Sequence, residues 1–211
     1  RPRLIADIEP LAKAVVNTML PGNYGGDALA NLIAGDANFS GKMPFTYPKE
    51  INSLITYDYK PCEHIGKQME GAYNYDAQVS VQWAFGYGLS YTRFEYSRPV
   101  VDKSRMSGSD TLSVEVTVSN KGGYDGEEIV QCYLSAPQWA VGGLKQKLIG
   151  HKRVFIAKGE SRKVSFTVCR EDLLRWNVNV KEWTALAGKY EVSVVPHSGE
   201  KNAVSFVYEG K

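Results

Sequence analysis

Residues 112–118 read LSVEVTV, and this stretch decides the fold of most of the chain. The apolar residues at 112, 114, 116 and 118 alternate with polar ones. Successive side chains of a β-strand point to opposite faces, so this period of two predicts a strand with one buried face. The cluster NKGGYDG at 120–126 is rich in turn-forming residues and ends the strand.

The same pattern of strands and turns continues to the end of the chain. Further apolar or alternating runs predict strands at 129–134, 147–156, 164–168, 190–194 and 204–208. Turn signals separate them, among them Lys158-Gly159 and Gly188. Several short strands punctuated by turns favour an all-β sandwich of the immunoglobulin-like or fibronectin-III-like kind, from about Phe94 onward.

The N-terminal part follows a different pattern, typical of the end of an α/β domain. The run AVVNTML at 14–20 is compact and mostly apolar, which predicts a strand buried on both faces of a parallel sheet. The loop PGNYGG at 21–26 follows, and Asp27 is the expected N-cap of a helix that Gly35 ends. Leu4-Ile5 suits a short strand and residues 10–13 a turn or short helix.

One strand and one helix bury too little surface to offset the entropy of ordering them. We therefore expect the rest of this α/β domain to be supplied by residues before Arg1 or by another chain. The predicted organisation has three parts: 1–50 ends the α/β domain, 51–93 is an aromatic-rich connecting arm, and 94–211 is the sandwich. Aromatic side chains at the density of the arm indicate packing across a domain boundary rather than a flexible linker.

Composition excludes several classes of function. The 25 basic and 23 acidic residues nearly cancel, and the basic residues at 145–153 are interrupted by other types, as on a solvated strand face. A nucleic-acid surface needs clustered Lys and Arg. No apolar run is long enough to span a bilayer. The chain begins Arg-Pro-Arg without a secretion leader, which a processed chain would also lack.

Cysteines and histidines predict no metal site and no disulfide framework. Cys62, Cys132 and Cys169 are an odd number at wide spacing, and the latter two lie in apolar strand patterns, as small buried residues do. His64, His151 and His197 lack the spacing of zinc ligands. We expect neither a metal nor a cofactor.

Three segments of the sequence carry a resemblance. The first reads LPGNYGGDALANLIAGD at 20–36 and continues as NFSGKMPFTYP at 38–48, the second reads FGYGLSYTRF at 85–94, and the third, looser one combines 120–128 with LIGHKRV at 148–154. Together they resemble family 3 glycoside hydrolases of the multidomain kind. Two positions depart from the family's usual pattern: Phe39 replaces a Pro, and Tyr24 replaces a common acidic residue.

The resemblance implies a flavodoxin-like α/β domain ahead of the sandwich and a retaining exo-acting β-glucosidase, with β-xylosides as alternative substrates. The family's nucleophile is an Asp in an upstream (β/α)8 barrel, and its acid/base Glu precedes Arg1. Retaining hydrolysis needs two carboxyl groups about 5–5.5 Å apart. Neither family motif matches a residue here, so no catalytic residue is assigned and this chain alone is expected to be inactive. Family habit implies a periplasmic or secreted location.

Among candidate site residues, Asn23 and Tyr24 stand out, because their loop follows the carboxyl end of the predicted parallel strand. They are hypothesised to reach the rim of the sugar pocket; packing at a domain interface is the alternative. The glycines of this loop lack the signatures of a phosphate loop. Asp27 and Asp36 are explained as cap and turn residues, and Glu127-Glu128 as charge at a sheet edge. Sugar stacking by Tyr73, Tyr75 and Trp83 is an alternative to their packing.

Three functions remain open on the residues alone. The leading one is a non-catalytic C-terminal portion that supports the domains of a β-glucosidase. The second is a free-standing module that binds carbohydrate or protein, against which the unpaired strand and helix count. The third is one chain of a two-chain β-glycosidase, whose partner carries the barrel.

Overall fold

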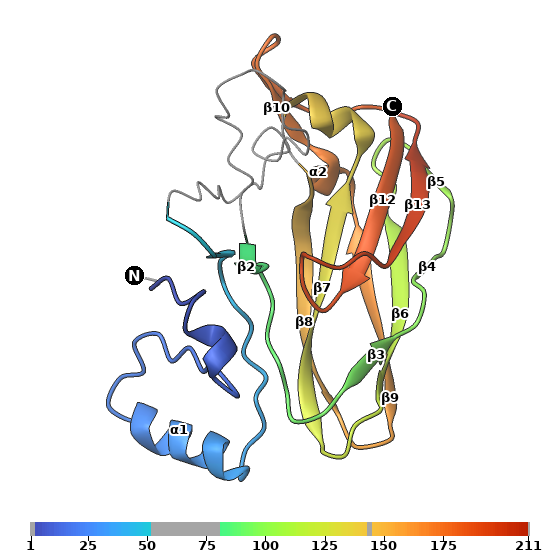
Figure 1. The fold of residues 1–211 in the computed structure, drawn as a ribbon. Coiled ribbons are helices and arrows are strands. Elements are labelled where there is room, and N and C mark those ends of the chain that lie inside the picture. The colour runs from blue at the N-terminus through green and yellow to red at the C-terminus, as the bar shows by residue number, and fades with distance from the viewer. Residues whose placement is uncertain (1–2, 52–80, 143–144, 211) are drawn as a thin grey trace.

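A computed structural model describes residues 3–51, 81–142 and 145–210. Most of them form a β-sandwich, and the N-terminal segment lies beside it (Figure 1). One sheet has five strands in the order β5-β13-β12-β7-β8. The other is built around β6, which pairs with β3 and β4 on one side and β9 on the other. The predicted sandwich is therefore confirmed.

The long strands carry the alternating patterns read from the sequence. Their bounds are β6 Leu112–Asn120, β7 Gly126–Ser135, β8 Lys147–Ile156, β9 Ser161–Val168, β12 Gly188–Val195 and β13 Ala203–Tyr208. The short strands are β3 Phe94–Tyr96, β4 Val100–Val101 and β5 Arg105–Met106. Neighbouring strands pair antiparallel except β5 and β13, which run parallel.

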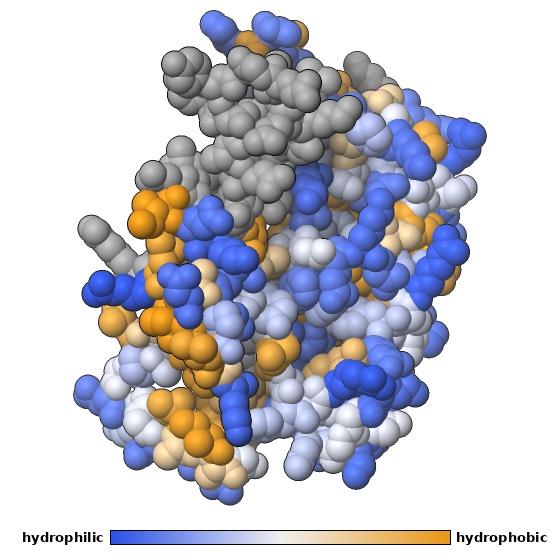
Figure 2. Space-filling view, in the orientation of Figure 1, coloured by the Kyte–Doolittle hydropathy of each residue, from blue (hydrophilic) through white to orange (hydrophobic). Residues whose placement is uncertain are grey.

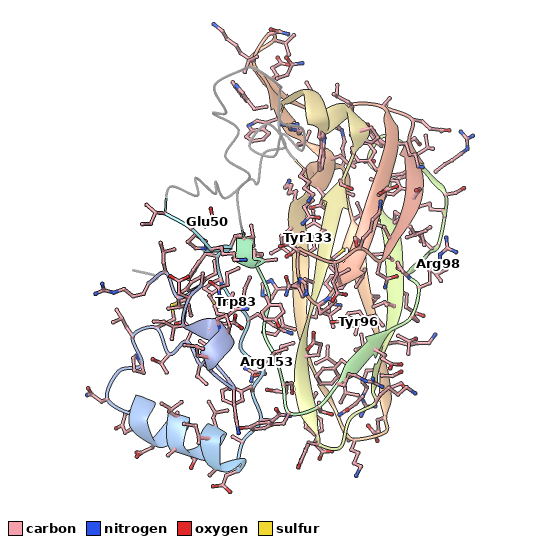
Figure 3. The ribbon with its side chains drawn as sticks, in the orientation of Figure 1. Glu50, Trp83, Tyr96, Arg98, Tyr133 and Arg153 are labelled. Carbon is pink, nitrogen blue, oxygen red and sulfur yellow. The ribbon has the colours of Figure 1, made fainter. Side chains whose placement is uncertain are left out.

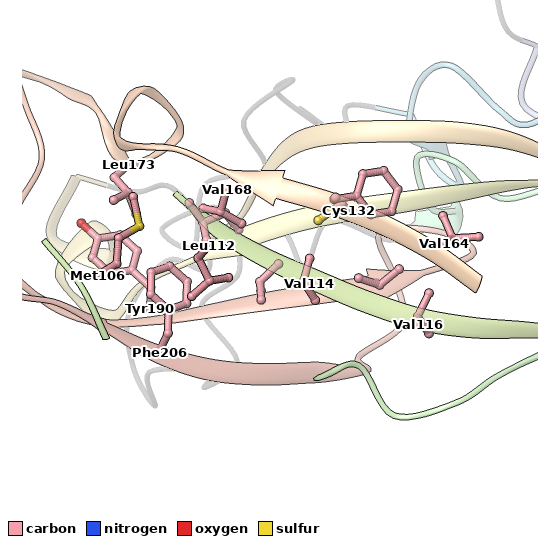
Figure 4. Packing of buried hydrophobic residues seen from close by; sticks show 14 of the residues in the cluster. Met106, Leu112, Val114, Val116, Cys132, Val164, Val168, Leu173, Tyr190 and Phe206 are labelled. Carbon is pink, nitrogen blue, oxygen red and sulfur yellow. The ribbon is translucent and has the colours of Figure 1, made fainter. Parts of the chain in front are cut away.

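The core lies between the two sheets (Figure 4). The even-numbered residues of β6 and β9 face those of β7, β12 and β13, and Tyr190 stacks on Phe206 with ring centroids 5.6 Å apart. Burying each such side chain contributes about 1.5–3 kcal/mol. Cys132 is wholly buried here, and burial raises the pKa of its thiol to about 12. The interpretation of Cys132 as a small core residue is confirmed. Cys169 is only partly buried and caps the short helix α2 (Arg170–Leu173).

A small hairpin, β10 (Arg175–Asn177) and β11 (Glu182–Thr184), stands off one end of the sandwich (Figure 1). Trp176 and Trp183 are direct cross-strand partners with ring centroids 5.9 Å apart, edge to face. Close to the hairpin's base, the 3-10 helix η3 (Pro137–Gly142) places Trp139 in the core, where Arg175 donates to its carbonyl.

The N-terminal segment departs from the expected α/β pattern. Residues 14–20 form no strand and are all exposed, and Leu4-Ile5 forms none either. A parallel strand satisfies its backbone groups only against neighbouring strands, and no described strand lies next to this run. The expected turn at 10–13 is found as the 3-10 helix η1 (Glu9–Leu11).

The expected helix is present as α1 (Gly25–Ala34), and it begins earlier than predicted. Tyr24 occupies the N-cap position, so Asp27 lies inside the first turn. There its carboxylate interacts favourably with the positive end of the helix dipole. The assignment of Asp27 as N-cap was wrong. Gly35 ends the helix with φ 86°, in the left-handed conformation expected of it.

A two-stranded ribbon, residues 38–48 and 81–91, lies between the N-terminal segment and the sandwich (Figure 1). It contains β1 (Tyr47–Pro48) and β2 (Val81–Trp83), and Met43 exchanges backbone hydrogen bonds with Gly86 and Tyr87. Trp83 packs its ring against Tyr47, 5.0 Å between centroids, which supports the packing reading for Trp83. Tyr73, Tyr75, Cys62 and His64 lie outside the described residues.

Candidate functional site

The contact between the ribbon and the sandwich, here called the seam, holds the most developed polar arrangement of the described chain. Lys42 of the ribbon reaches Glu128 on β7, with Nζ 3.1 and 3.2 Å from the two carboxylate oxygens. The same ammonium donates to the carbonyl of Gly88 at 3.2 Å. An ammonium has three donors, and all three are therefore satisfied here. The side chains are only 11% and 4% exposed.

Tyr96 on β3 completes this network. Its hydroxyl donates to Oε1 of Glu128 at 2.8 Å. Burial raises the pKa of Glu128 above its ordinary value, and the Lys42 ammonium opposes that rise. Burial, followed by the adjacent carboxylate, raises the pKa of Tyr96 beyond its ordinary range. Tyr96 therefore stays a neutral donor, and the network consists of a paired carboxylate and ammonium capped by a hydroxyl.

Glu128 corrects the sequence interpretation. Glu127 and Glu128 were expected to carry charge at a sheet edge; β12 pairs with β7 only at Gln131–Ser135, so this part of β7 pairs with β8 alone, but Glu128 is buried rather than exposed to solvent. Glu128 shares the phase of the core residues Val130 and Cys132, so its carboxylate points into the molecule, where only a buried cation makes it tolerable. Glu127 pairs with Arg153 across to β8. Arg153 also reaches Ser40 at 3.1 Å, and it lies beside the ribbon in Figure 3.

A second set of polar contacts joins the glycine-rich part of the ribbon to the sandwich. Gln131 donates to the carbonyls of Gly86 at 3.1 Å and Pro196 at 2.6 Å, and accepts from the Tyr133 hydroxyl. A Cβ added at Gly86 would overlap the Gln131 amide, and one at Gly88 would overlap the carbonyl of Gly41. Gly86 is thus required by close approach of the ribbon to the sandwich, and Gly88 by close approach of the two strands of the ribbon to each other.

His197 lies next to this contact and pairs with a carboxylate. Its ring packs edge to face against Tyr87, 5.3 Å between centroids, and Nε2 lies 3.3 Å from Glu200. Nδ1 accepts from the amide of Gly199, so Nε2 carries the proton of the neutral ring. Burial lowers the pKa of His197 below its ordinary value, and Glu200 works against that shift.

The predicted pocket-rim residues lie apart from these contacts, in the turn that leads into α1. Both Asn23 and Tyr24 are exposed, Tyr24 by 83%. Gly22, just before them, has φ 67° and so gives the turn the left-handed conformation that glycine favours. The structure therefore presents both side chains to solvent on the N-terminal segment, and their role remains a proposal.

A broad apolar surface covers the same segment. Figure 2 shows hydrophobic side chains gathered on the side of the molecule formed by the N-terminal segment and α1. The exposed apolar residues there include Leu4, Ile8, Leu11, Val15, Val16, Met19, Leu20, Ile33 and Ile51. Leu20 is 97% exposed. Contiguous exposed apolar surface of this kind marks an interaction site.

Among the described residues, no cluster of three or more His, Cys, Asp or Glu is arranged to hold a metal ion. No helix within the described ranges is both long and apolar enough to cross a membrane.

Comparison with known families agrees with the family resemblance that the sequence motifs indicate. Residues 1–91 match the model of the glycosyl hydrolase family 3 C-terminal domain, and residues 128–198 match that of the fibronectin type III-like domain. The chain belongs to glycoside hydrolase family 3. The predicted fold class, an α/β domain end followed by a fibronectin-III-like sandwich, is confirmed.

Curated relatives of this family 3 chain are glycosidases. A β-glucosidase of Bacteroides ovatus is 30% identical over 206 residues, covering 92% of this chain and 28% of the relative. A β-xylosidase of Formosa agariphila is 33% identical, covering 92% of this chain and 26% of the relative. The chain therefore spans little more than a quarter of the length of these relatives.

Two solved structures share the arrangement. A β-glucosidase of Bifidobacterium adolescentis matches with a TM-score of 0.79 at 29% identity, over 97% of this chain and 31% of that one. A β-D-glucoside glucohydrolase of Trichoderma reesei matches with a TM-score of 0.80 at 26% identity, over 98% of this chain and 32% of that one. This chain thus corresponds to one portion of larger enzymes.

Proposed function

We propose that this chain is the non-catalytic C-terminal portion of a retaining, exo-acting β-glucosidase that removes glucose from the non-reducing end of β-glucosides. The observation that carries the proposal is the match of residues 1–91 to the family's C-terminal domain, in a chain that spans 28% of the Bacteroides ovatus β-glucosidase. Hydrolysis would take place on carboxylates outside this chain, and the sandwich would support the domain that carries one of them.

The exposed apolar surface of the N-terminal segment supports this role. Side chains such as Leu11 and Leu20 have no cover in the described chain, and a run like 14–20 satisfies its backbone in a sheet. The proposed cover is the rest of the α/β domain, in the same chain or in a partner, together with the upstream barrel. Under this proposal residues 14–20 become a strand when that cover is present.

The test compares the 211-residue chain with the enzyme that also contains the barrel and the complete α/β domain. The chain alone should release no nitrophenol from an aryl β-glucoside, whereas the full-length enzyme should. Hydrolysis by the isolated chain at homogeneous mass would refute the assignment. The Formosa agariphila relative gives reason to run aryl β-xyloside in parallel, since β-xylosidase activity is the second candidate.

Asn23 and Tyr24 are proposed to contact sugar at the pocket rim, because their loop precedes α1 at the end of the run expected to form a parallel strand. Asn23→Ala and Tyr24→Ala in the full-length enzyme should raise KM more than they lower kcat. Unchanged kinetics and stability in the double variant would refute the idea. A periplasmic or secreted location is proposed on family habit alone, and cell fractionation tests it.

A further inference from the structure

We propose that the buried Lys42–Glu128 pair sets the register in which the ribbon docks on the sandwich, and thereby positions α1 and the loop before it. The inference rests on the proposed function where it concerns catalysis. Its structural part, a positioning role for two named residues, stands on the seam alone.

The seam contains a pair with a single satisfied geometry. Lys42 donates its three hydrogen bonds to Glu128 and to the carbonyl of Gly88, and the Tyr96 hydroxyl donates to Oε1 of the same carboxylate. A shift of the ribbon by one residue would leave both charges buried without partners. Desolvation largely cancels the attraction within a buried ion pair, so such a pair contributes little net stability, and its best-attested use is to fix register.

The ladder inside the ribbon fixes the alignment of its two strands only weakly, and the other hydrogen bonds between the ribbon and the sandwich, such as Gln131 to Gly86 and Asn38 to Asp125, involve no pair of opposite charges. The described pairing between β1 and β2 spans two residue pairs and contains an irregularity. Beyond it, Met43 exchanges backbone hydrogen bonds with Gly86 and Tyr87. Short ladders of this kind permit slippage unless a side chain specifies the alignment.

The ribbon in turn holds the helix. Asn38 donates from Nδ2 to the carbonyl of Asp125 in the β6–β7 turn at 2.8 Å. Its Oδ1 accepts from the Ser90 hydroxyl and the Tyr91 amide, each at 2.9 Å. The Tyr91 hydroxyl then donates to the carbonyl of Leu32, in the last turn of α1, at 2.7 Å. A continuous set of hydrogen bonds therefore runs from the sandwich through the ribbon to α1.

The decisive variant replaces both charges at once in the full-length enzyme, Lys42→Met with Glu128→Leu, and is made in a Tyr96→Phe background so that no buried hydroxyl loses its acceptor. Removing both charges of a buried pair is often neutral or stabilising. We expect an unfolding temperature at or above that of wild type, together with faster hydrogen exchange at the amides of Met43, Gly86 and Tyr91. We expect kcat/KM for aryl β-glucoside to fall about tenfold or more, since small misplacements far from the chemistry have costs of this size.

Two further variants separate positioning from simple stabilisation. Glu128→Leu alone buries an unpaired ammonium and should lower the unfolding temperature, whereas Lys42→Arg keeps the charge and should retain protection from exchange. The matched control is the exposed pair on β9 and β6, Lys163→Met with Glu115→Leu, whose ions lie 2.9 Å apart. This control should leave both exchange at the ribbon and catalysis unchanged.

Three results would overturn the proposal. Wild-type exchange and kinetics in the double variant would mean that other contacts set the register. A double variant that is unfolded, or less stable throughout, would make the pair a source of stability rather than of position. Failure of Lys42→Arg to retain protection would exclude a role for the charge. A wild-type enzyme that hydrolyses no β-glycoside would refute the proposed function instead, and exchange would still judge the register.

Discussion

At the scale of single residues, the glycines of the FGYG motif show how a sequence signature becomes a packing requirement. Gly86 has φ 81°, and a Cβ there would overlap the Gln131 side chain. Gln131 cannot easily give way, because it bonds to the carbonyls of Gly86 and Pro196 and to the Tyr133 hydroxyl. Both the backbone conformation and the available space therefore demand glycine.

Gly86→Ala should lower the free energy of unfolding by about 1–3 kcal/mol, from backbone strain and the displaced amide. Urea denaturation measures the change. Gly123→Ala is the control, because nothing lies within 4 Å of a Cβ at that position, and its effect should stay within about 0.5 kcal/mol. Equal effects of the two substitutions would contradict the packing argument.

His197 provides a prediction about pH. Burial lowers its pKa below the ordinary value of 6.5, so the unfolded state binds the proton more readily than the folded state. Its contribution to stability is therefore fully present above about pH 7 and is lost as the pH falls through 6.5 toward the lowered pKa. His197→Gln removes this titration, and the stability lost between pH 8 and about pH 5.5 should be smaller in the variant than in wild type.

Thermal unfolding at the two pH values measures the loss of stability in wild type and in the variant, and the two losses are then compared. Comparison with a variant is necessary because Glu128, whose pKa burial raises, contributes with the opposite sign. His151→Gln, at an exposed position on β8, is the control substitution. Parallel pH curves for wild type and His197→Gln would refute a role for burial of this ring.

At the scale of elements, the long strands were predictable and the seam was not. Strands such as β6 and β9 can be predicted from the alternation of apolar and polar residues, because one face of each strand packs on the core and the other meets solvent. The short strands β3 to β5 contain two or three residues each, too few to display a period. Their pairing depends on tertiary contacts that no local pattern encodes.

The candidate site depends on contacts between residues far apart in sequence. Lys42 and Glu128 are 86 positions apart, and only the fold brings them together. One local signal was available: Glu128 lies in the core-facing phase of a strand that continues with Val130 and Cys132, and a charge in that phase needs a buried partner. The strand predicted at 14–20 is not formed: a parallel strand needs neighbouring strands, and no described strand lies beside this run.

The β10–β11 hairpin gives an element-scale prediction. A two-stranded hairpin is marginal by itself, and here Trp176 and Trp183 pack edge to face across it. Substituting either by Ala should lower stability, and the coupling energy between them in a double-mutant cycle should be about 0.5–1.5 kcal/mol. Val178→Ala at the exposed tip should change stability by less than about 0.5 kcal/mol. A coupling energy of zero would mean that the indoles stabilise the hairpin independently.

At the scale of the whole molecule, the N-terminal part has one surface that is exposed and another that is buried against the sandwich. The apolar side chains around α1 lie open, whereas the ribbon shares buried hydrogen bonds and an ion pair with the sandwich. Energetically the ribbon therefore belongs with the sandwich, and the segment before residue 38 belongs with whatever covers its apolar face. We propose an energetic boundary near residue 37, which lies inside the 1–91 match to the family's C-terminal domain and is earlier than the boundary at 93 that composition suggests.

Two truncated chains test where this boundary lies. Residues 38–211 keep the ribbon and should unfold cooperatively, with the seam intact. Residues 94–211 lose Lys42, Gly86 and Gly88, which leaves Glu128 and Gln131 without their partners across the seam. At about 1 kcal/mol for each lost hydrogen bond, the shorter chain should be less stable by a few kcal/mol in urea denaturation.

Glu128→Gln should destabilise 38–211 but leave 94–211 nearly unchanged, because the carboxylate has already lost its ammonium there. Equal stability of the two chains, or an equal response to Glu128→Gln, would place the ribbon with the α/β domain instead.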